Sequence, residues 1–128
     1  MLSLFLAAAL VQTAPDTVFP APAPVETEPV DLPIAQQTAL RCAVAIALAT
    51  ERQRLDKAQD QNWPDLLANQ RGREFFVRSF AKLMDDTGLS REDLALRGHK
   101  EAEQLASEDD RLDAIMPACL LMLDASGL

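Results

Sequence analysis

Beyond Pro33, apolar residues recur at the spacing of amphipathic helices, and no stretch alternates as a strand would. The first helix is predicted to begin just after Pro33 and to end near Gln59. Its apolar positions form two adjacent stripes: Leu40, Val44, Leu48 and Leu55 in one, and Cys42, Ile46 and Ala49 in the other. Because the stretch from Arg41 to Ala49 is apolar on nearly all sides, we expect its neighbours to enclose it. It is therefore predicted to be the central helix.

A second helix is predicted from Asn62-Trp63-Pro64-Asp65, where Pro64 suits a first turn, to about Asp86, with Thr87-Gly88 as the stop. Gly72 is a weak point at which this helix bends or splits. The expected inward face comprises Phe76, Phe80, Leu83 and Met84, with Phe75 and Leu67 at its border. The pairs Glu74–Arg78 and Lys82–Asp86 have the four-residue spacing of ion pairs on an exposed helix face.

Two further helices follow. Ser90, three residues before Asp93, is a predicted N-cap of the third helix, which contains Gly98. Ser107-Glu108-Asp109-Asp110 begins the fourth, where carboxylates suit the positive end of the helix dipole. Pro117 falls inside the fourth helix and is expected to kink or divide it. The sequence thus predicts an all-α domain over residues 34–128, a compact bundle of four to five helices.

The N-terminal region differs in composition. The run Leu2–Val11 is apolar but far shorter than the roughly 20 residues that span a bilayer, so residues 1–14 are predicted to be a signal peptide. No Lys or Arg precedes the run, which leaves open a buried N-terminal helix of a cytosolic protein. Residues 15–33 contain six of the eight prolines and are predicted to be an extended, disordered spacer or simply a flexible leader.

The formal net charge of −8 disfavours nucleic acid and anionic membrane surfaces as partners. Part of that charge lies before the helices, so the helical domain is only mildly acidic, with both signs interspersed.

The two cysteines lie in apolar settings, Cys42 in the first predicted helix and Cys119 in the last. In an oxidising compartment a Cys42–Cys119 disulfide is the expected outcome, and the alternative is two separate buried thiols. Neither cysteine belongs to a Cys-x-x-Cys motif of the kind that redox enzymes use.

Three groups of polar residues are candidate sites. The only histidine, His99, with Glu103 four residues later, is too small a set for a metal site. The acidic cluster Glu108, Asp109, Asp110 and Asp113 lacks the glycine of a calcium loop and is interpreted as compensation of the helix dipole. The basic residues Arg71, Arg78 and Lys82 suit either an anionic ligand or neighbouring carboxylates, and the carboxylates are favoured. We predict no catalytic residues, no metal and no cofactor.

The segment from Leu83 to Leu94 resembles the helix-turn-helix of DNA-binding proteins, since Gly88 ends one helix and a hydrophobic residue follows. Met84 and Arg97 depart from that pattern, and Glu92 and Asp93 would bring negative charge to DNA.

The layout of this chain resembles that of small exported bacterial proteins of uncharacterised function. It consists of an apolar leader, a proline-rich spacer and a helical domain with a cysteine near each end, and its most distinctive segment is Arg71–Phe76. This resemblance implies an exported, periplasmic or extracellular protein, without a transmembrane span in its mature form. We predict a non-enzymatic interaction or structural accessory of the cell envelope that acts on a protein partner. The alternatives are a periplasmic stress chaperone, by a weaker likeness to small helical acid-stress chaperones held by one disulfide, and the DNA-binding protein.

Overall fold

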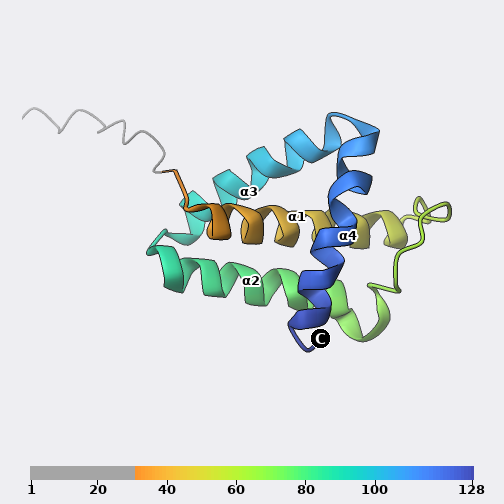
Figure 1. Ribbon diagram of the computed structural model, residues 1–128, viewed down its shortest axis with the longest axis horizontal. Helices are drawn as coiled ribbons and strands as arrows, with labels where there is room; N and C mark the ends of the chain where they lie inside the picture. The colour runs from red at the N-terminus through yellow and green to blue at the C-terminus, as the bar shows by residue number, and fades with distance from the viewer. Residues whose placement is uncertain (1–30) are drawn as a thin grey trace, which may run out of the picture. The chain divides into compact units, whose positions relative to one another are not determined.

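The computed structural model describes residues 31–128. The predictions of a signal peptide and of nearly all of the spacer fall outside these residues and stay predictions. Within the described residues the chain forms four α-helices and no strand, which confirms the all-α bundle (Figure 1).

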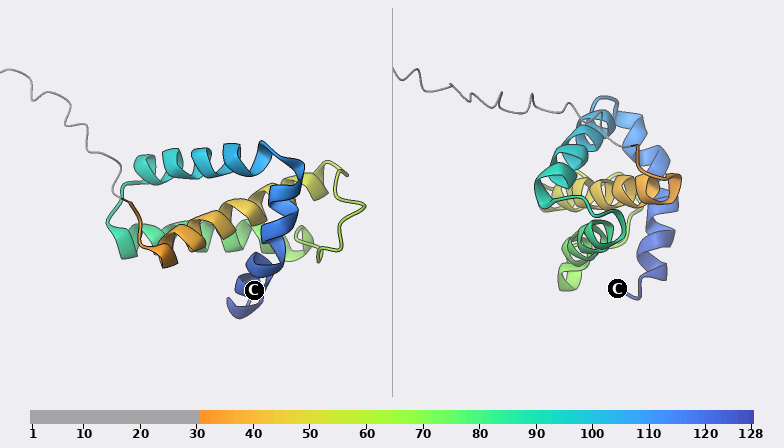
Figure 2. Two further views of the ribbon diagram at one scale, coloured as in Figure 1. Left: turned by 45° about the horizontal axis from the view of Figure 1, so that its top comes forward. Right: turned by 90° about the vertical axis from the view of Figure 1, so that its left-hand side faces the viewer.

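Helix α1 (Ile34–Arg54) is the centre of the bundle, because three other helices all pack against it: α2 (Arg71–Thr87), α3 (Arg91–Ala106) and α4 (Asp109–Ala125) (Figures 1 and 2). Every residue from Cys42 to Ile46 is buried, which is why this stretch needs no polar face. Arg41, the one charged residue of the apolar stretch, is exposed and pairs with Glu101 of α3 at 3.2 Å.

The first helix is shorter than predicted. It ends at Arg54, and the chain turns at Asp56, whose φ of 56° is left-handed. Leu55 was expected to face inward, but it is 45% exposed. The buried apolar stripe of α1 ends at Ala49, so a longer helix would have no buried apolar side chains to pack its last turn against the core.

The predicted start of the second helix at residues 62–65 is wrong. The chain instead runs without regular structure to a short 3₁₀ turn, η1 (Ala68–Gln70), in which Asn69 and Gln70 have positive φ. Gln53 of α1 holds this connection, because its amide accepts from Leu66 N and donates to the Pro64 carbonyl, both at 2.8 Å. Leu66 is thereby fully buried in the core, whereas Leu67, placed at the border of the core by the sequence, is 44% exposed.

Helix α2 (Arg71–Thr87) runs antiparallel to α1 (Figure 1). Gly72 lies in its first turn and neither bends nor splits it. A Cβ at Gly72 would collide with Thr50 Oγ1 of α1, so glycine is required for the close approach of the two helices. The helix ends as predicted at Gly88, which has φ 70° and donates its N–H to the Met84 carbonyl.

Helix α3 (Arg91–Ala106) begins with the predicted cap, since Ser90 Oγ accepts from Asp93 N at 3.1 Å. Gly98 is buried, and a Cβ there would lie 3.1 Å from Phe80 Cζ of α2 and 3.8 Å from Val44 Cγ2 of α1. Gly98 is therefore a contact point with both neighbours.

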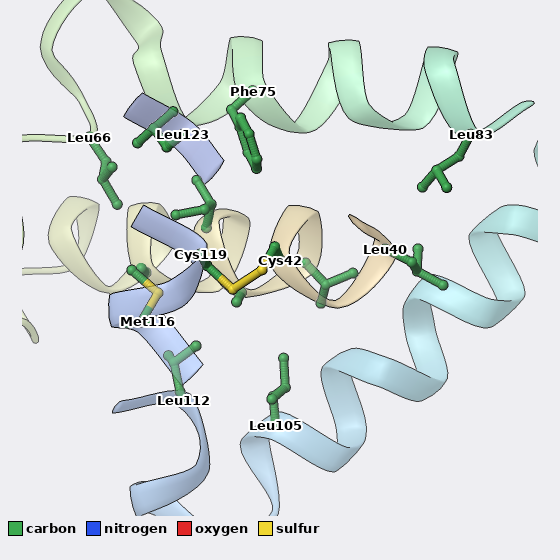
Figure 3. Close-up of a cluster of buried hydrophobic side chains, with 14 of the residues drawn as sticks. Leu40, Cys42, Leu66, Phe75, Leu83, Leu105, Leu112, Met116, Cys119 and Leu123 are labelled. Atoms are coloured by element: carbon green, nitrogen blue, oxygen red, sulfur yellow. A yellow bond between two sulfur atoms is a disulfide. The ribbon is translucent and has the colours of Figure 1, made fainter. Parts of the chain in front are cut away.

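Helix α4 (Asp109–Ala125) crosses α1 and is not divided at Pro117 (Figure 2). Pro117 has no N–H to donate to the carbonyl of Asp113, four residues earlier. Because Pro117 is exposed, this carbonyl lies on the solvent side of the helix. The buried face of α4 consists of Leu112, Met116, Cys119 and Leu123. Cys119 meets Cys42 with their sulfur atoms at disulfide-bonding distance, inside the apolar cluster of Figure 3. The bond joins residues 77 positions apart and links the last helix to the central one.

Candidate interaction groove

An open groove of about 1020 Å³ lies between α2 and α3, with α1 as its floor. It exists because α2 and α3 each pack along α1 while making little contact with each other. The α1 residues of the floor are Val44, Ala47 and Leu48. The α2 side comprises Phe76, Val77, Phe80, Ala81 and Met84, and the α3 side Arg91, Glu92, Ala95, Leu96, Gly98, His99 and Ala102.

This finding confirms part of the predicted inward face of the second helix, because Leu83 is buried and Phe80 and Met84 pack against the core, and corrects the rest. Phe75 and Leu83 are the residues buried in the core, whereas Phe76, Phe80 and Met84 are only half-buried and line the groove. The rings of Phe76 and Phe80 stack with centroids 4.3 Å apart, tilted by 31°. Phe80 and Met84 also pack against the core, so they contribute apolar surface both to the bundle and to the groove.

Two large apolar side chains stand exposed along the groove. Val77 of α2 is 52% exposed and Leu96 of α3 is 63% exposed. Isolated apolar residues on a surface are ordinary, but a continuous apolar groove with such residues on both sides is characteristic of a binding surface.

The polar residues of the lining all come from α3. They are Arg91, Glu92 and His99, each of them exposed. Within residues 31–128, none of the three has a side-chain hydrogen bond or an ion pair. The charged residues of the lining, Arg91 and Glu92, therefore both lie on the α3 side and have opposite signs.

A second, smaller groove of about 540 Å³ lies between the start of α1, α2 and the end of α4. Arg78 and Lys82 line it, but each has a carboxylate partner, Glu74 at 3.7 Å and Asp86 at 2.9 Å, as the sequence predicted. The hydrogen bond that Lys82 donates to the Asp86 carboxylate raises the pKa of Lys82.

Arg71, the third residue of the predicted basic face, lies elsewhere. It donates to the Leu128 carbonyl at 2.7 Å and to Asp124 at 2.9 Å, and so ties α2 to the end of α4. The structure does not bring the three basic residues together as an anion site.

The acidic cluster is dispersed in the same way. Glu108 pairs with Arg111 at 3.0 Å, while Asp113 accepts from Gln61 at 3.1 Å and lies 3.9 Å from Arg52. Among the described residues, no three His, Cys, Asp or Glu side chains gather as metal ligands would.

The turn of the helix-turn-helix resemblance is present, because α2 ends at Gly88 and α3 begins at Arg91. Nothing in the fold tests DNA binding, which stays a prediction. Glu92, on the helix that would enter DNA, lines the groove instead.

No family model matches the chain, and no curated protein or solved structure matches it either. No helix within residues 31–128 combines the length and apolar character needed to cross a membrane.

The groove was not foreseen, although the sequence held a signal for it. Phe75, Phe76, Phe80, Leu83 and Met84 cover more of the circumference of α2 than contact with one neighbouring helix requires. Helical periodicity alone assigns this excess apolar width to the core, because it shows only which residues share a face.

Proposed function

We propose that this is an exported, non-enzymatic protein of the cell envelope that works by binding a protein partner in the groove between α2 and α3. The observation that carries the proposal is the open apolar surface between Val77 and Leu96. Covering these side chains would remove apolar area from water, at about 25 cal/mol per Å². Binding of a helix in an apolar groove is a recurrent mode of protein recognition.

Export is supported by the Cys42–Cys119 pair. The two residues are 3% and 1% exposed, and a disulfide is stable in oxidising compartments but rare in the cytosol. The apolar run Leu2–Val11 and the proline-rich stretch after it are consistent with the same destination.

Site-specific photo-crosslinking in the native host tests the proposal. A photoreactive residue at Leu96 is expected to give a discrete protein adduct. The matched control is Leu121 of α4, which is 70% exposed and lies outside the groove. Equal labelling from Leu96 and Leu121, or none from either, would contradict binding in the groove.

The groove also favours a second candidate, a stress chaperone that holds apolar segments of unfolded proteins. This function requires the apolar surface to grow under acid stress. Dye binding and suppression of aggregation would be measured together from pH 7 to pH 3, over which the carboxylates become protonated. A flat response in both measurements would eliminate the chaperone.

A further inference from the structure

We propose that the Lys57–Ala58 peptide bond is a processing site for a Lys/Arg-specific endopeptidase, which converts the folded protein into two chains linked by the Cys42–Cys119 disulfide. The bond is hydrolysed: the oxygen of water goes to the Lys57 carbonyl carbon, which becomes a carboxylate, and Ala58 gains an amine. The inference goes beyond the proposed function and does not depend on it, because no residue of the connection between α1 and η1 lines the groove.

Lys57 is the basic residue that the helices do not protect. The chain has 12 Lys and Arg residues, and all of them except Lys57 lie within α1, α2, α3 or α4. An endopeptidase takes its substrate in an extended form, so cleavage at a helical residue requires local unfolding first. Lys57 instead lies in the irregular connection between Leu55 and Leu67, and its side chain is exposed. Exposed connections of this kind are the preferred sites of proteolytic nicking.

The peptide bond itself is held by few contacts. The Lys57 N–H donates to the Arg52 carbonyl at 2.8 Å and so ends the turn that follows α1. Within residues 31–128, neither the Lys57 carbonyl nor the Ala58 N–H has a hydrogen-bond partner. The segment can therefore open towards an active site at a low cost in free energy, without disturbing a helix.

The disulfide spans the proposed cut. Cys42 lies before it and Cys119 after it, so the two product chains keep one covalent link. The first chain carries α1, whose buried stretch from Cys42 to Ile46 belongs to the centre of the bundle. The link keeps α1 at a high effective concentration beside the other helices. Gln53 also keeps its hydrogen bond to Leu66 across the cut, so the cleaved protein is expected to retain the bundle and the groove.

Limited digestion of the purified, oxidised full chain by trypsin tests the inference. No Lys or Arg precedes Arg41, so every tryptic cut falls in the part of the chain that the structure describes. The first cut is expected after Lys57, and mass spectrometry of the new ends would identify it. Without reductant the product should have the mass of the whole chain plus one water, and with reductant it should separate into two fragments. The unreduced product should keep the helical circular dichroism of the uncut protein.

Lys57→Gln should slow the first cut by about tenfold or more, because the remaining basic residues become accessible only through local unfolding. Lys57 is exposed, so this variant should keep its fold. Arg54→Gln is the matched control, since it removes the nearest other basic residue, at the end of α1, and should be cut at the wild-type rate.

Three results would each overturn the inference. They are a first cut at another bond, an unchanged rate of cleavage in Lys57→Gln, and a loss of the helical signal after cleavage while the disulfide is intact. None of them bears on the groove, which the crosslinking experiment tests separately.

Discussion

The bond between Cys42 and Cys119 should supply a large share of the stability of this domain. The two residues are 77 positions apart, so the bond closes most of the helical domain into one loop. The chain-entropy relation then gives about 4.5 kcal/mol of stabilisation at 25 °C, and measured disulfides typically give about 2–4 kcal/mol. Domains of ordinary stability have only about 5–15 kcal/mol in total.

Two perturbations separate the cross-link from the packing. Reduction breaks the bond but leaves both sulfur atoms in the core, so it should cost about 2–4 kcal/mol of unfolding free energy. Cys42→Ala with Cys119→Ala also removes two buried atoms, and each cavity should add about 1 kcal/mol, as for the loss of one buried methyl group.

Guanidinium denaturation followed by far-UV circular dichroism measures both losses. The wild type would be compared with and without reductant, and the double variant treated in the same way is the control for the reductant itself. The reasoning would be refuted if reduction changed the unfolding free energy of the wild type by less than about 1 kcal/mol. The same result would remove the main structural support for export.

Three further predictions concern single contacts. Gly72→Ala should destabilise the domain by about 1–3 kcal/mol in denaturation, because the added Cβ meets Thr50. Thr50→Ala should relieve part of that cost, so additive losses of unfolding free energy in the double variant would contradict the contact. Gln53→Ala should lower the free energy of unfolding by about 1–2 kcal/mol, because the Leu66 amide loses its acceptor. Hydrogen exchange at the Leu66 amide should become faster, and unchanged exchange would argue against that hydrogen bond. The hydrogen bond from Arg54 lowers the pKa of Glu51 below 4.5, so the pair stabilises the folded state at neutral pH and loses this stabilisation as pH falls through the folded-state pKa. Arg54→Ala should raise the pKa of Glu51 in an NMR titration, and no rise would contradict the pairing.

Local signals in the sequence were sufficient for much of the fold. Ser90 marks the start of α3 and Gly88 the end of α2 because a cap and a left-handed terminus are satisfied by atoms a few residues away. The apolar stretch Arg41–Ala49 indicated the central helix, since a segment apolar on nearly all sides has to be enclosed. The two cysteines indicated which helices meet.

Only the tertiary structure decided which apolar residues are core and which are surface. Phe75 and Phe76 are adjacent and equally apolar, yet Phe75 is buried and Phe76 lines the groove, because Phe75 shares a helix face with Gly72, which packs closely against Thr50 of α1. Leu66 likewise enters the core through hydrogen bonds to Gln53, thirteen residues away. A helical period specifies which residues share a face, but the neighbour that each face meets depends on contacts between distant parts of the chain.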